Sequence, residues 1–329
     1  MSETVAEFME KPVKKYACGR KAKEAKKSLI KAFAASEEKR RPQESALFTE
    51  IISSVMKTKK GRETMTTLSK LGYSFAFESG EFGGFCDAEN KKIVINPSSN
   101  FEYMLQTVVH EGRHAIQNSL EKPDAPHYAL TQVASMLRCR RAIEADAVAH
   151  EMAFVYECKD VLPKVYQDAK EQNLPMFRAF VGEMEKSGDE RKAMQASFAA
   201  WYECDYYRDY YDKYYKKGII DNCEWGKNNK QGNLFSKEYS AEDVMKMCRY
   251  KGQTYMKPEF LNKGLAFSIP AEDKKVISVA LQSYADAVGE KPDTSVSAMR
   301  SRLPDGTLLP ESNNAAKTAV AVKTARNGR

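Results

Sequence analysis

The sequence predicts an α+β protein that is mostly helical and carries one small antiparallel or mixed sheet. Short segments of alternating or apolar residues, typical of strands, are confined to about residues 73–96. Beyond residue 100, long stretches repeat apolar residues at spacings of three and four, which is the helical period. With 329 residues, of which 42% are hydrophobic, the chain can bury a sizeable core.

Residues 1–41 are predicted to form a basic extension, part helix and part arm. They contain 12 Lys and Arg against 6 Asp and Glu, and so hold most of the net charge of +7. Such a segment could touch an acidic partner, a membrane surface or nucleic acid, although a solvated helix face is more common and no nucleic-acid signature accompanies it. We expect the main domain over 42–289. A disordered basic tail is expected over 290–329, where Pro, Ser, Asn and Thr are frequent.

Between these limits the apolar pattern predicts helices, three strands and then further helices. Pro42 and Gly72 are typical of a helix start and a helix end. The strands are expected at 73–77, 85–87 and 92–96, after helices at 44–56 and 62–70. Later helices are expected at 101–119, 129–159, 161–172, 176–186, 189–216, 240–250 and 271–288, with a turn-rich loop at 222–232.

The helix over 101–119 contains the most informative motif, His110-Glu111-Gly112-Arg113-His114, an H-E-x-x-H sequence. Residues four apart share one face of a helix, so His110 and His114 can place two imidazole nitrogens on one metal ion. Glu111 is then placed to act on a water that the metal activates. The motif predicts a zinc hydrolase, with Zn²⁺ as cofactor and Glu111 as general base.

A catalytic zinc usually takes three protein ligands, so one more is expected. The extension that metzincins carry is absent, because Gln117 and Leu120 stand where Gly and His are needed. The best candidate is Glu144, whose alanine neighbours would let two helices approach closely. Rival ligands, in descending order, are Asp146, His150, Glu151 and His127. Asp146 and His150, which are four apart, could instead orient a ligand.

A donor to the developing oxyanion is also expected, and the sequence leaves it open among Arg113, His127 and the tyrosines of the 189–216 helix. Spacings of three and four predict that these tyrosines mainly pack in the core, with hydroxyl tips reaching partners. They are Tyr202, Tyr206, Tyr207, Tyr210, Tyr211, Tyr214 and Tyr215. An exposed strand beside the metal, either 84–87 or 93–95, could bind an extended peptide by strand addition.

The cysteines and the N-terminal sequence bear on the compartment. Seven cysteines, an odd number without a C-x-x-C pair, predict reduced thiols rather than a disulfide framework. The first residues lack an apolar signal core, and no apolar run reaches the length of a membrane span. We therefore expect a cytoplasmic protein without a membrane span, and leave export by a non-classical route open.

The motif and its surroundings resemble a family of bacterial metallopeptidases of gluzincin type, most of which have no assigned substrate. The residues that carry the resemblance are Gly84-Phe85, the segment from Ile93 to Pro97, the segment from His110 to Gln117, and the segment from Glu144 to Ala147. The resemblance implies a zincin-like core, zinc held by His110, His114 and Glu144, and Glu111 as base. Better-studied gluzincins carry Asp four residues after the ligand Glu to support the first His. Here that position is Val148, so support must come from Asp146 or elsewhere.

The sequence thus predicts a zinc-dependent peptidase that acts on a peptide or protein substrate. Two alternatives remain at this stage. One is a catalytically inactive zincin-like module that binds protein, and the other is an adaptor whose basic arm contacts nucleic acid or membrane.

Overall fold

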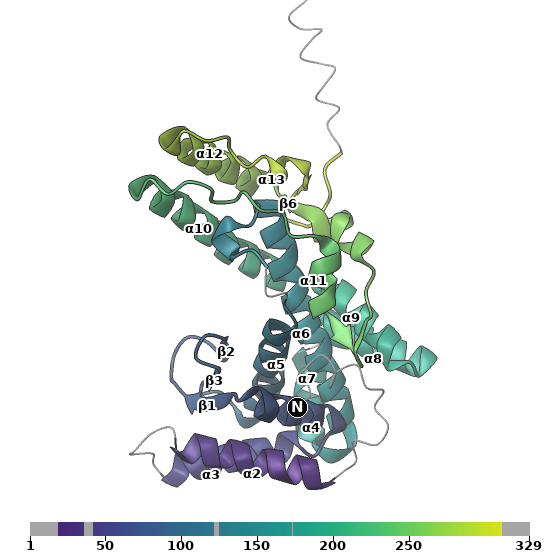
Figure 1. Cartoon of the computed structure of the whole chain (residues 1–329). Coiled ribbons are helices and arrows are strands. Elements are labelled where there is room, and N and C mark those ends of the chain that lie inside the picture. The colour runs from purple at the N-terminus through teal and green to yellow at the C-terminus, as the bar shows by residue number, and fades with distance from the viewer. Residues whose placement is uncertain (1–18, 36–41, 122–124, 173, 311–329) are drawn as a thin grey trace, which may run out of the picture.

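Two long helices, α5 (Phe101–Leu120) and α6 (Val133–Val161), pack against each other in the middle of the molecule (Figure 1). The computed structural model describes residues 19–35, 42–121, 125–172 and 174–310. Helices dominate, and a small sheet directly precedes α5. This arrangement confirms the predicted α+β class.

The sheet consists of β1 (Ser74–Phe77), β2 (Gly84–Asp87) and β3 (Lys92–Ile95), in the order β1-β3-β2. β3 pairs in parallel with β1 and antiparallel with β2, so the sheet is mixed. Of the two strands proposed to bind substrate, β3 is therefore central, and only β2 lies at an edge. A Cβ on Gly84 would come within 2.6 Å of the Thr107 side chain, so glycine lets β2 approach α5 closely.

Three helices cover the sheet and α5: α2 (Gly19–Ala35), α3 (Pro42–Val55) and α4 (Lys59–Leu71). Gly72 ends α4 in the left-handed conformation, as predicted. Leu29 and Phe33 of α2 are buried, and the Phe33 ring stacks on Phe48 at 3.9 Å. Part of the expected basic extension is thus packed on the core, while residues 1–18 and 36–41 lie outside the described residues.

The C-terminal half is built mainly from helices. They are α7 (Pro163–Gln172), α8 (Pro175–Ser187), α9 (Glu190–Glu203), α10 (Asp205–Asn228), α11 (Ala241–Met247), α12 (Ala271–Val288) and α13 (Ser295–Ala298). Short 3-10 helices are η1 (Tyr128–Leu130), η2 (Pro258–Asn262) and η3 (Gly264–Phe267).

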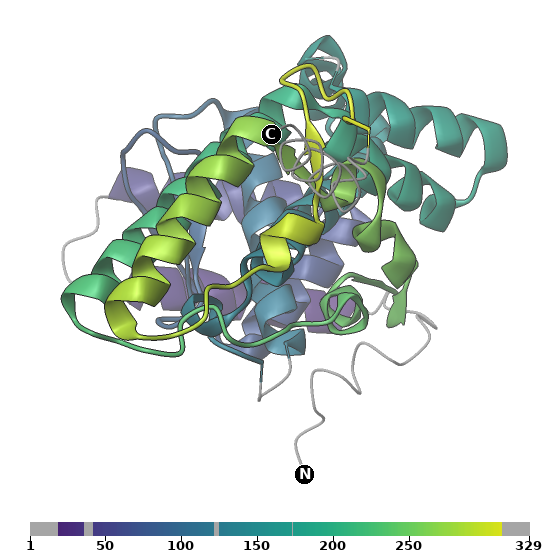
Figure 2. The same ribbon diagram turned by 90° about the horizontal axis from the view of Figure 1, so that it is seen from above.

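Two expectations for this half differ from the structure. The helix predicted over 189–216 is divided at Cys204 into α9 and α10, and α10 continues through much of the predicted 222–232 loop. The continuation is stabilised by packing, because Cys223 is buried and α12 lies along α10 (Figure 2). A Cβ on Gly226 would come within 2.6 Å of the Tyr284 ring, so this glycine allows the close approach.

Four short strands complete the described chain: β4 (Arg249–Tyr250), β5 (Gln253–Thr254), β6 (Ser268–Pro270) and β7 (Arg300–Arg302). Runs of two or three residues are too short to show alternation in a sequence. β7 pairs in parallel with β6, and Val296 and Met299 before it are buried. Residues 295–302, within the segment expected as a disordered tail, thus form a short helix and a strand packed on the fold. Residues 311–329 lie outside the described part.

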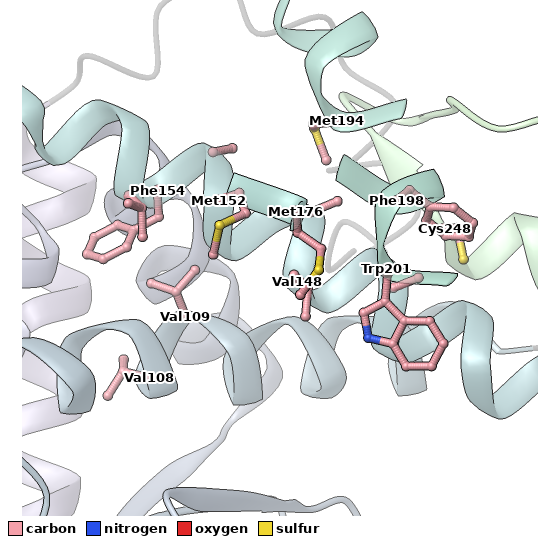
Figure 3. Close-up of a cluster of buried hydrophobic side chains, with 14 of the residues drawn as sticks. Val108, Val109, Val148, Met152, Phe154, Met176, Met194, Phe198, Trp201 and Cys248 are labelled. Atoms are coloured by element: carbon pink, nitrogen blue, oxygen red, sulfur yellow. The ribbon is translucent and has the colours of Figure 1, made fainter. Parts of the chain in front are cut away.

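The buried apolar side chains form two clusters. The larger one joins α5 and α6 to the helices around them, as Figure 3 shows for Val109, Val148, Met176 and Trp201. The smaller one lies between α10, α12 and the first turns of α6. The six cysteines within the described residues are free. In the same part of the chain, no helix is both long and apolar enough for a membrane span.

Candidate metal centre

The two histidines of the H-E-x-x-H motif and one glutamate of α6 face a common centre. His110 and His114 lie one turn apart on α5, and their Nε2 atoms are 3.2 Å apart. The Oε2 atom of Glu144 lies 3.5 Å from each of these nitrogens. Among the described residues, these three side chains form a group that could hold a metal ion. The structure thus brings together the three residues that were predicted as ligands.

The three ligand atoms fit a tetrahedral metal ion. Ligands about 2.0–2.2 Å from a tetrahedral zinc are roughly 3.3–3.6 Å apart, close to the 3.2 and 3.5 Å separations here. The Oε2 atom of Glu144 is buried without a hydrogen-bond partner, which is costly unless a cation meets it. Burial tends to raise the pKa of the Glu144 carboxyl, but the His114 and His110 imidazoles outweigh burial and hold that pKa well below its usual range.

A second residue holds each histidine through its other ring nitrogen. The Nδ1 atom of His110 lies 3.0 Å from Oε2 of Glu151, and Nδ1 of His114 lies 2.8 Å from Oε1 of Gln117. When Nδ1–H donates to such an oxygen, Nε2 is left as the free ligand atom. Glu151 therefore supplies the support for the first histidine that Val148 cannot give.

Asp146 is completely buried and stabilises this arrangement through three hydrogen bonds. Its carboxylate accepts hydrogen bonds from Nε of Arg113 at 2.6 Å, from Nε2 of Gln117 at 2.6 Å and from the Tyr255 hydroxyl at 2.8 Å. Gln117 thereby links Asp146 to His114. Asp146 fixes the position of His114 through this chain of contacts, and it lies outside the group that could hold the metal.

The other residues predicted for the site lie apart from it. Besides Asp146, Arg113 binds the backbone carbonyl of Arg249 at 3.1 Å, so its guanidinium is engaged in joining elements. His150 contacts the same carbonyl through Nε2 at 3.0 Å, and its Nδ1 lies 3.4 Å from the Lys60 ammonium. His127 caps η1 and is exposed. None of these three side chains belongs to the His-His-Glu group found among the described residues.

Glu111 is nearly buried beside the two ligand histidines. Burial raises the pKa of its carboxyl, against the opposing effect of His110 and His114. A carboxyl with a raised pKa accepts a proton more readily, as a general base must. Cys86 lies near Glu111, and burial raises the pKa of its thiol to about 12, so this thiol is protonated at neutral pH.

Tyrosines of α10 also lie close to the site. Burial, and then the charge of Glu144, raise the pKa of the Tyr211 hydroxyl. Burial, and then the charge of Glu144, also raise the pKa of Tyr215. Burial, and then the charge of Glu151, raise the pKa of Tyr207. Of the tyrosines predicted on this helix, these three therefore lie nearest to the ligands and their supports.

From the sequence, Gln117 has no predicted role and Glu151 is predicted only as a rival ligand. Signals for both were present, because Glu151 lies seven residues, or two turns, after Glu144 and so shares its face. Gln117 lies three residues after His114, on the neighbouring turn. Their partners could be recognised only once the helices had been placed.

Comparison with known proteins agrees with this geometry. Residues 22–253 match the model of a family described as "Putative metallopeptidase family (DUF6782)". No curated protein and no solved structure matches the chain significantly. The matched region contains both helices of the metal centre, the sheet, and α10. Since it covers well over half of the sequence, the chain belongs to this metallopeptidase family.

Proposed function

We propose that the protein is a zinc-dependent peptidase of gluzincin type, with zinc held by His110, His114 and Glu144. The observation that carries the proposal is the triangle of ligand atoms, with Glu111 buried beside it. Membership of a metallopeptidase family supports a peptide or protein as substrate. When bound, zinc would supply Lewis-acid chemistry that polarises the scissile carbonyl and activates water.

We assign the other steps of the reaction to residues of the chain. Glu111 takes a proton from the attacking water and passes it to the leaving amine. Glu151 and Gln117 hold the histidine rings in the orientation that presents Nε2. Arg113 and His127 are engaged elsewhere, so the α10 tyrosines are the remaining predicted candidates, and Tyr211 is the one we assign to donate a hydrogen bond to the oxyanion. The edge strand β2 pairs with the extended substrate.

The test compares metal content and cleavage in three proteins. Wild type should contain about one zinc per chain and cleave a peptide library, whereas Glu111→Gln should keep the zinc and lose cleavage by about 100-fold or more. His110→Ala should lose the zinc. If His110→Ala binds as much zinc as wild type, the ligand assignment is wrong. Zinc binding without cleavage in wild type would favour the inactive protein-binding module.

A further inference from the structure

The tyrosines of α10 come in three consecutive pairs, and the two members of each pair face different surroundings. The inward members, near Glu144 and Glu151, are Tyr207, Tyr211 and Tyr215. The outward members, which we call the exposed tyrosine row, are Tyr206, Tyr210 and Tyr214. They are 76%, 62% and 68% exposed, respectively. Because they are spaced four apart, they lie along one side of the helix.

The fold accounts for the inward tyrosines but not for the exposed row. The ring contacts of the row within the described residues are with the inward member of the same pair, at centroid distances of 5.6, 5.4 and 5.9 Å. Tyrosine is enriched where proteins bind other chains, because it offers a large rigid face and a hydroxyl at low entropic cost. Three such side chains in a line are typical of a binding surface.

The row is continuous with the metal centre. The ring of Tyr206 lies 5.6 Å from that of Tyr207, and Tyr207 lies next to Tyr103 of α5 beside the site. Tyr103 is 44% exposed and packs over Gly83, next to the edge strand β2. A small cavity beside the site is lined in part by Tyr103, Tyr207 and Glu151. In Figure 1, the sheet and α10 extend from the same side of α5 and α6.

We propose that the exposed tyrosine row binds the part of an extended polypeptide substrate that runs beyond the metal centre. This inference rests on the proposed peptidase function and adds a substrate class, unfolded polypeptide rather than very short peptides. From Tyr206 to Tyr214 the helix rises about 12 Å, which matches about four residues of extended chain. Unfolded segments display the apolar and cationic side chains that tyrosine faces bind.

The test measures binding and cleavage separately. Binding of fluorescein-labelled casein, an unfolded polypeptide, is measured by anisotropy in the zinc-loaded Glu111→Gln protein. Replacing Tyr206, Tyr210 and Tyr214 together by Ser should raise the Kd for casein about tenfold or more. In the otherwise wild-type protein, the same replacement should raise KM for casein and leave kcat/KM for tetrapeptides unchanged. The matched control is Val276→Ser with Val279→Ser on α12, two apolar residues that are 39% and 70% exposed.

Three results would overturn the inference: unchanged casein binding, an equal loss for tetrapeptides and casein, or the absence of casein binding by every form. Sedimentation could give a fourth contradicting result. If wild type is a dimer and the triple replacement is a monomer, the row forms a contact between two copies of the protein. The proposed function fails separately, when wild type with full zinc cleaves neither probe. Casein binding to the Glu111→Gln protein is read independently of that outcome. Melting temperature and zinc content of the triple variant check that it is folded.

Discussion

At the scale of single residues, the carboxylate that holds His110 is the feature that most affects the metal. Glu151 contacts Nδ1 of His110 at 3.0 Å, and both side chains are largely buried. Without it, the imidazole can rotate and adopt the other tautomer. We therefore expect Glu151→Ala to weaken zinc binding by about 10–100-fold.

A competition titration with a chelator would measure this loss. Glu157→Gln is the matched control, because Glu157 lies on the same helix and accepts the backbone N–H of Lys60 instead. Glu151→Gln should recover part of the affinity, since an amide oxygen can still accept from Nδ1. Equal zinc affinity in Glu151→Ala and wild type would show that Glu151 does not position the ligand.

His150 makes stability depend on pH. Burial first, and then the charges of Arg113 and Lys60, hold its pKa well below the ordinary value near 6.5. Above that value the ring is neutral in both the folded and the unfolded protein, so the stability of the fold is not reduced by protonation of the unfolded chain. As pH falls, the unfolded chain takes up a proton that the folded protein cannot, and stability is lost.

Between pH 7.5 and 5.5, wild type should lose about 1 kcal/mol more unfolding free energy than His150→Gln. The glutamine can still donate to the carbonyl of Arg249. Urea unfolding of both proteins at the two pH values measures the difference. An identical pH dependence would mean that His150 titrates normally.

At the scale of elements, the strand β7 ties the end of the described chain to the core. Arg302 of β7 and Arg141 of α6 both bind the carboxylate of Asp212 on α10. All three side chains are buried, so removal of Arg302 leaves Arg141 to share Asp212 with solvent. Buried pairs of this kind are strongly destabilising when one member is lost.

A protein ending at residue 289 should therefore be less stable than one ending at residue 310 by about 3 kcal/mol or more. The shorter form also loses the buried Val296 and Met299. Arg302→Ala in the full chain separates the ionic effect from the apolar one. Equal stability of the two truncated forms would contradict the role given to β7.

Elements with long apolar repeats could be predicted well from the sequence, and those fixed by distant contacts could not. The H-E-x-x-H helix and the strands before it lie within one or two residues of their predicted bounds, because caps such as Asn100 and Gly72 are local signals. The break at Cys204 has no such signal. The pairing of β6 with β7 joins segments about 30 residues apart, and nothing in either segment identifies the other.

At the scale of the whole molecule, the same distinction applies to the site. Spacing along one helix was enough to predict that His110 and His114 share a metal, and the alanine neighbours of Glu144, together with the resemblance, favoured it as third ligand. The choice between the two candidate substrate-binding strands, and the assignment of Glu151 as the support of His110, required the relative placement of α5, α6 and the sheet. The predicted limits 1–41, 42–289 and 290–329, and the cytoplasmic location, remain predictions.

The long helix α6 also sets how far the molecule can deform. It runs unbroken for 29 residues, with its first turns in the smaller hydrophobic cluster and its later turns in the larger one. Glu144 lies between these two regions. Moving α10 away from the sheet would bend α6 and strain its backbone hydrogen bonds. We therefore expect the separation between β2 and α10 to be the same in structures solved with and without a bound peptide.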